Sequence, residues 1–251
     1  MYYAFRLWCF FLILLVFCGS RCIHAGTLIV DGMANVFAAG LSSPPALAFG
    51  GGELPPVFNI PAANGQVLTF SSVTGSVSGN VGVFPFNGPD GLVPHVTFVG
   101  PLGGISGIRD DNAFMFLAGV FLDDSLPSGS PPPILNFTNA ENFTELFPSV
   151  AQVFFIGDGL TGSGTGTTQV FHVPATATRL FLGFADTDAV ANPPGAYSDN
   201  GGAFTASFQI VPEPGSLGLF FAGAIVFVGV WVLSPERAAP RKLQKGGHEQ
   251  I

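Results

Sequence analysis

The chain has 251 residues, of which 48% are hydrophobic and only 10% are charged, and its formal net charge is −8. From Gly26 to Val211 the only cationic side chains, apart from histidines, are Arg109 and Arg179, against 13 Asp and Glu residues. This long central part lacks the basic surface with which proteins displace counterions from phosphates, which excludes nucleic-acid binding.

The N-terminal segment predicts export. Arg6 and the amino group give a short positive region, an apolar run follows over 7–18, and Ala25 is a small residue at a plausible cleavage point. Twelve residues are too few to span a hydrocarbon core, which takes about 20 helical residues. We predict a signal peptide over 1–25, cut after Ala25, with an uncleaved membrane anchor as the alternative. All three cysteines lie in this segment, so cleavage would leave no disulfide, thiolate metal site or cysteine nucleophile.

The next segment, 26–56, has few large apolar residues beyond those of 28–31 and is rich in Gly, Ala, Ser and Pro. This composition is typical of a linker, because it offers little apolar surface to bury. We therefore predict an N-terminal arm over 26–56 and a folded domain that begins at Val57.

Residues 57–211 predict an all-β domain. Short apolar or alternating runs recur along this part, and clusters of Gly, Pro, Asn and Asp separate them. Frequent turns between short strands favour a β-sandwich. The predicted strands are 66–70, 95–99, 114–122, 151–156, 169–173, 179–184 and 203–210.

The loop between the last two predicted strands carries the clearest candidate site. Asp186 and Asp188 follow the first strand, and Asp199 and Asn200 precede the second. If the two strands pair as a hairpin, these four side chains converge. Calcium takes six to eight oxygen ligands at about 2.3–2.6 Å from carboxylates, amides and backbone carbonyls, and the carbonyl of Ala196 can add one. The alternative is that Asp and Asn are here only as turn formers.

The residues around this loop carry a family resemblance. Leu-Phe-Leu-Gly-Phe-Ala-Asp at 180–186 and Pro-Gly-Ala-Tyr-Ser-Asp-Asn-Gly-Gly-Ala-Phe at 194–204 resemble the final hairpin of the calcium-dependent galactose-binding bacterial lectins. That family implies a small jelly-roll β-sandwich in which calcium bridges the protein and sugar hydroxyls. Asp replaces an amide at 199, and the insertion before Pro194 is longer than in the family.

The resemblance also implies a set of metal ligands. They are the side chains of Asp186, Asp199 and Asn200 and the carbonyl of Ala196, with a further carbonyl from an earlier loop near 80–81. We add Asp188 and Tyr197 to Asp186 as predicted contacts with the sugar.

The C-terminal end predicts a sorting signal. Pro212-Glu213-Pro214 precede an apolar run at 217–233, and the basic residues that follow are Arg237, Arg241, Lys242 and Lys245. Seventeen helical residues rise about 25 Å, enough to cross a thin bilayer, and the positive charges favour a cytoplasmic tail over 234–251. The motif, the span and the basic tail together resemble the PEP-CTERM signal of Gram-negative bacteria. That resemblance implies processing near the motif by an exosortase, a membrane cysteine protease. A plain single-pass anchor is the alternative.

The sequence thus predicts an exported protein of the cell envelope, on the outer surface or secreted, that is not an enzyme. Its favoured function is binding of extracellular polysaccharide through calcium. One alternative is a purely structural biofilm or surface component, in which the Asp-rich loop is only a turn. The other is a secreted carbohydrate-active enzyme that uses carboxylates such as Asp110 and Asp123.

Overall fold

The computed structural model describes residues 23–61 and 65–213, which belong to one compact unit ending at Glu213. The predicted transmembrane helix, the basic tail, Pro214 and the predicted signal peptide before residue 23 lie outside the described residues. Within 23–61 and 65–213, no helix is long and apolar enough to cross a membrane.

The described residues form a nearly all-β fold with one short 3-10 helix, η1 (Val36–Ala38). The strands are β1 (His24–Asp31), β2 (Val57–Asn59), β3 (Gln66–Ser78), β4 (Thr97–Val99), β5 (Ile108–Asp110), β6 (Ala118–Leu122), β7 (Leu135–Asn136), β8 (Glu145–Leu146), β9 (Val153–Phe155), β10 (Leu160–Gly162), β11 (Thr165–Thr168), β12 (Val170–Val173), β13 (Arg179–Gly183) and β14 (Gly201–Pro212).

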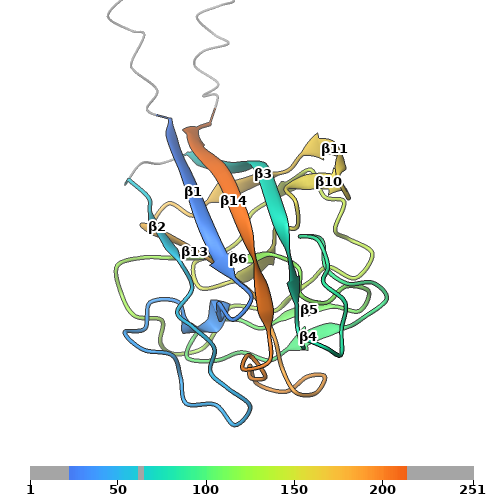
Figure 1. Ribbon diagram of the computed structural model, residues 1–251. Helices are drawn as coiled ribbons and strands as arrows, with labels where there is room; N and C mark the ends of the chain where they lie inside the picture. The colour runs from blue at the N-terminus through green and yellow to red at the C-terminus, as the bar shows by residue number, and fades with distance from the viewer. Residues whose placement is uncertain (1–22, 62–64, 214–251) are drawn as a thin grey trace, which may run out of the picture. The chain divides into compact units, whose positions relative to one another are not determined.

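Two larger sheets organise the fold (Figure 1). The first has the order β1-β14-β3-β12-β8 and the second the order β2-β13-β6-β9. Aromatic side chains join them: Phe58 of β2 meets Phe208 of β14 edge-on with ring centroids 5.1 Å apart, and Phe154 of β9 lies 5.4 Å from Phe171 of β12. This arrangement is consistent with a β-sandwich, in which the inner faces of two sheets share one core.

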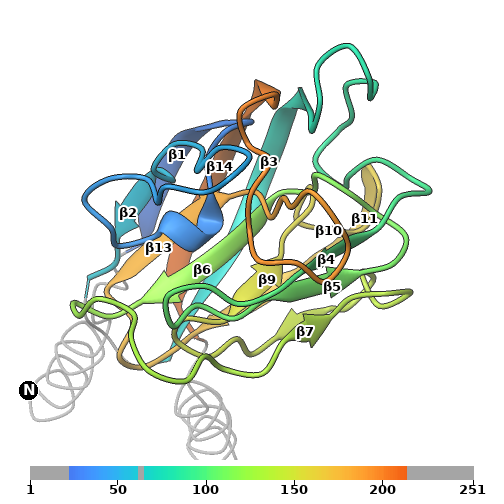
Figure 2. The ribbon, with the colours of Figure 1, turned by 90° about the horizontal axis from the view of Figure 1, so that it is seen from below.

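The second sheet is covered on both faces except at its edge strand β2. All five residues of β6 are buried, although a strand exposed on one face would alternate. Beyond β6 lies a smaller sheet of order β4-β5-β7, visible in Figure 2. Phe155 of β9 joins the two layers through contacts with Phe116 and Phe137, at centroid distances of 4.9 and 5.7 Å.

The predicted strands are confirmed. Each of the seven apolar runs between residues 66 and 210 overlaps an observed strand, and β14 shows the alternation that the sequence predicts. Its buried residues are Phe204, Ala206, Phe208 and Ile210, and their neighbours point outward or lie half-buried. The apolar pattern did not predict how long β3 and β14 are. These two strands pair with each other over most of their lengths.

The prediction of an arm over 26–56 is wrong, because this segment packs into the sandwich. β1 pairs with β14 from His24↔Ile210 to Asp31↔Ala203, and η1 is fully buried. The glycine that suggested a linker is a packing residue: a Cβ on Gly26 would lie 2.8 Å from the Phe208 ring and 2.9 Å from the Phe58 ring. The predicted cut after Ala25 would remove the first two residues of β1.

The prediction that strands 179–184 and 203–210 pair as a hairpin is also wrong. β13 lies between β2 and β6 in one sheet, whereas β14 lies between β1 and β3 in the other. Both edges of β14 are therefore occupied, and the loop from Phe184 to Asn200 crosses from one sheet to the other. The loop ends still meet, because β13 finishes and β14 begins at the same end of the sandwich (Figure 1).

Candidate functional site

The crossing loop forms one wall of a hollow of about 510 Å³. Two other loops contribute to it: residues 48–50, which follow η1, and residues 79–84, which follow β3. Figure 2 shows the crossing loop between these two neighbours at one end of the fold. Phe114, which precedes β6, adds a fourth segment, so four stretches of chain that are distant in sequence supply the walls of a single solvent-facing site.

Asp186 is the most unusual side chain of this hollow. It lines the hollow although the residue is only 2% exposed. Its Oδ1 accepts a hydrogen bond of 2.7 Å from the backbone N–H of Thr187, while its buried Oδ2 has no hydrogen-bond partner. Buried polar atoms are nearly always paired, so an unpaired carboxylate oxygen in this position calls for a ligand or a proton.

Asn200 offers a second unpaired oxygen. Its Nδ2 donates to the carbonyl oxygen of Gly32 at 3.1 Å, and its buried Oδ1 has no hydrogen-bond partner. The Asn200 side chain lies close enough to Asp186 to lower the pKa of its carboxyl, so the two buried oxygens without a hydrogen-bond partner come from the two ends of the crossing loop.

The electrostatics of Asp186 reflect this environment. Burial raises the pKa of Asp186 to about 8, while the Asn200 side chain and the backbone N–H of Thr187 lower it and the charge of Asp199 raises it further. A carboxylate is unfavourable here without a positive charge beside it. A bound cation would offset that cost.

The predicted ligands Asp199 and Ala196 line the same hollow, and so does Asp188. The backbone carbonyl of Asp199 accepts a 2.8 Å hydrogen bond from the N–H of Val81, which fixes the crossing loop to the loop after β3. Ala196 has φ = 67°, a left-handed conformation that costs a residue with a Cβ about 1 kcal/mol or more. Asp188 accepts a hydrogen bond of 3.2 Å from Nδ2 of Asn192 at the exposed side of the loop.

Tyr197 does not occupy a position from which it could contact a ligand. The residue is fully buried, and its hydroxyl donates to the carbonyl of Phe184 and accepts from the N–H of Asp186, both at 3.1 Å. The predicted sugar contact is therefore replaced by a structural role: Tyr197 holds the strand end that carries Asp186.

Sequence reasoning missed part of the hollow. Asn80 and Gly79 line the hollow, and they belong to the earlier loop in which a carbonyl ligand was expected. Phe49 and Gly50, however, come from the segment 26–56 that its composition predicted to be an arm. The hydrogen bond from Ser198 Oγ to the carbonyl of Phe49, 3.2 Å, connects these loops. No local signal in the sequence links residues 149 positions apart.

A cation here would need mixed oxygen ligands. In the described parts of the chain, no three His, Cys, Asp or Glu side chains gather closely enough to hold a metal ion by themselves. The hollow is lined by three carboxylate residues, by Asn80 and by backbone carbonyls, and the unpaired amide oxygen of Asn200 lies beside Asp186; this set of oxygen donors suits calcium more than zinc or copper.

The predicted sorting motif begins inside the fold. Pro212 is the last residue of β14 and lies opposite Gln66, and the N–H of Glu213 donates to the carbonyl of Gly65 at 2.6 Å. Oε1 of Glu213 lies 2.7 Å from Nδ1 of His172, whose Nε2 lies 3.1 Å from Oε2 of Glu145. The motif thus starts at the opposite end of β14 from Asn200.

Comparisons with known proteins add no relative: no family model matches the sequence, and neither a curated protein nor a solved structure shows significant similarity to it.

Proposed function

We propose that this chain is an exported envelope or extracellular-matrix protein whose jelly-roll-like β-sandwich binds polysaccharide through calcium. The calcium ligands are Asp186, Asp199 and Asn200 by their side chains and Ala196 by its carbonyl. The C-terminal motif that starts at Pro212 directs sorting by an exosortase-type protease, and the apolar run after it holds the chain in the membrane until then.

The observation that carries this proposal is the buried, unpaired Oδ2 of Asp186 at a solvent-facing hollow, together with a second buried, unpaired oxygen on Asn200 beside it. Each unsatisfied buried polar group costs about 1–3 kcal/mol. A calcium ion removes that cost for both oxygens, and its remaining coordination positions are free for sugar hydroxyls. A purely structural component would have a proton to compensate Asp186 but nothing to pair with the Asn200 oxygen.

The enzyme alternative has less support from the geometry. Asp110 is completely enclosed, and its Oδ1 accepts hydrogen bonds from the N–H groups of Asn112 and Ala113. Oδ1 of Asp123 accepts from Ser125 in a tight turn. One oxygen of each carboxylate is thus engaged by its own turn, as in turn-forming Asp residues generally. The other oxygen of Asp110 has no partner, but it is enclosed in the core and lines neither hollow.

Thermal unfolding of the purified chain with and without calcium tests the proposal. Calcium at about 100 times its Kd stabilises by about 2.7 kcal/mol, and each kcal/mol corresponds to roughly 2–4 °C in a domain of this size. We therefore expect the Tm to rise by about 5–10 °C. Asp199→Ala and Asp186→Asn should abolish this rise, and Asp124→Ala, at the far end of β13, should retain it.

A glycan array with and without chelator provides the functional readout. Binding that calcium supports and chelator removes is the expected result. An unchanged Tm in millimolar calcium removes the metal from the proposal, and calcium binding without any glycan binding favours a structural role.

A further inference from the structure

A second hollow adjoins the candidate calcium site. It has a volume of about 240 Å³, and it shares Phe84, Phe114, Thr187 and Asp188 with the larger hollow. Its own walls include Phe98 of β4 and Val190 of the crossing loop. A ligand that extends from the calcium site on this side therefore passes over Phe84 and Asp188 into a second hollow that is also open to solvent.

The two hollows differ in chemistry. The larger one is lined by Asp186, Asp199 and Asn80, whereas the smaller one is mostly aromatic and aliphatic. Phe84 between them is fixed in place, since its ring packs edge-on against Phe114 at 5.7 Å and against His95 at 5.2 Å. A polar end and a rigid apolar end together fit a ligand that has hydroxyl groups on its edges and C–H groups on its faces.

The charge of the surroundings favours a neutral ligand. The described residues contain two arginines and no lysine. The guanidinium of Arg109 lies 5.0 Å from the centroid of Phe98 but makes two hydrogen bonds to Asp111, of 2.9 and 2.6 Å. Arg179 donates to the carbonyls of Asp123 and Ser125. Since neither arginine of the described residues is free, an anionic headgroup or phosphate would depend mainly on the bound calcium.

From this arrangement we infer that the site takes a chain of at least two neutral sugar residues. One residue binds calcium beside Asp186 and Asp199, and the next lies against Phe84 and Phe114 and extends toward Phe98 and Val190. This inference rests on the proposed function and adds to it that the ligand is an oligosaccharide segment and not a terminal monosaccharide alone.

A ladder of β-linked galacto-oligosaccharides, from mono- to tetrasaccharide, tests the inference by calorimetry on the purified chain in calcium. We expect the disaccharide to bind about tenfold more tightly than the monosaccharide, the gain that about 1.4 kcal/mol of added contact gives. Val190→Asn and Phe98→Ala should remove this gain and leave monosaccharide binding unchanged. Val190 is 61% exposed, so its substitution does not disturb the core.

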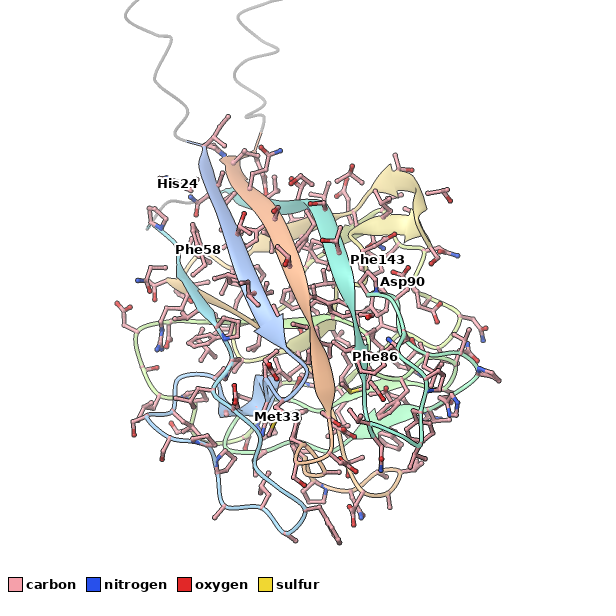
Figure 3. All side chains as sticks on the ribbon, viewed as in Figure 1. His24, Met33, Phe58, Phe86, Asp90 and Phe143 are labelled. Atoms are coloured by element: carbon pink, nitrogen blue, oxygen red, sulfur yellow. The ribbon has the colours of Figure 1, made fainter. Side chains whose placement is uncertain are left out.

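Phe86→Ala is the matched control. Phe86, labelled in Figure 3, lies on the same loop as Phe84 and is 52% exposed, but it lines neither hollow. Its variant should retain the full gain. Equal affinity for all members of the ladder overturns the inference and leaves the calcium proposal standing.

Two further outcomes also overturn the inference. One is a gain that persists in both Val190→Asn and Phe98→Ala. The other is a failure of every ladder member to bind, including the case in which the chain sediments instead with phosphatidylserine vesicles in calcium. The thermal shift in calcium then decides separately whether the metal site survives.

Discussion

Two buried carboxylates in this protein, Asp186 and Asp110, lie where a negative charge is unfavourable. Asp186 keeps one oxygen without a partner at the hollow, and Asp110 keeps one inside the core beside Glu141. For Asp186 a cation is the compensation that we propose. For Asp110 the charge that acts on the carboxyl is that of another carboxylate, Glu141, so a proton is the available compensation at low pH.

The stability of the fold should therefore depend on pH through Asp110. Burial raises the pKa of Asp110 to about 6, against the hydrogen bond from Asn112, and the charge of Glu141 raises it further. Because the folded state holds this proton more tightly than the unfolded chain does, the stabilisation is present below about pH 4 and is lost as the pH rises through about 6.

Asp110→Asn removes the charge and keeps the acceptor for the N–H groups of Asn112 and Ala113. Between pH 4 and pH 7 the free energy of unfolding of the wild type should fall relative to this variant, by about 3 kcal/mol at most. Urea unfolding at a series of pH values measures the difference. The exposed Asp124→Asn is the control, and parallel pH profiles for wild type and Asp110→Asn would contradict the assignment.

At the level of elements, the sequence was informative about strands and much less so about their partners. Alternation in β14 and the apolar runs of β6 and β13 predict extended structure, because these patterns arise locally from burial of one or both faces. Pairing depends on which edges are free after the other strands have docked. For that reason the convergence of Asp186 with Asn200 could be predicted, although the hairpin invoked for it does not exist.

The strand β1 shows why composition misled. A glycine in a sequence is usually taken as a sign of a flexible linker. Gly26 is instead required for packing, because the rings of Phe208 and Phe58 approach the backbone at this position (Figure 3 labels Phe58). Phe208 and Phe58 are distant in sequence from Gly26, so only the folded structure reveals this requirement. The same holds for the part of the hollow that Phe49 and Gly50 supply.

Gly26→Val tests whether β1 is an integral strand. The added side chain meets both rings closer than 3 Å, and such overpacking destabilises by about 1–3 kcal/mol. We expect the Tm to fall by roughly 2–4 °C for each kcal/mol. Thr27→Val, one position along on the exposed face, adds no volume and loses only a solvent-exposed hydroxyl contact with Ser207, so it should leave the Tm almost unchanged. Equal Tm values for the two variants would mean that β1 does not pack against β14.

In the whole molecule, β14 connects the two regions to which we assign function. It begins directly after Asn200 and ends at Pro212, and its 12 residues extend roughly 40 Å at about 3.3 Å per residue. β1 begins beside the end of β14, so both strands have their outer ends at one end of the sandwich (Figure 1), whereas the hollow is lined by residues just before the start of β14. A domain held through its C-terminal segment would thus keep the hollow away from its point of attachment.

Processing at the motif is the prediction that tests this organisation. In its own host, the chain at the cell surface should have lost the residues after the Pro212-Glu213-Pro214 region, as intact mass would show.

Glu213→Ala should block the cut, since the motif is what the protease recognises in our proposal. This variant also removes the contact with His172, and His172→Ala removes that contact while it keeps the motif intact. Normal cutting of His172→Ala with no cutting of Glu213→Ala assigns the effect to the motif, whereas loss of cutting in both assigns it to the fold. A surface form of the wild type that still ends at Ile251 would contradict the sorting proposal and leave the calcium site to be judged by its own test.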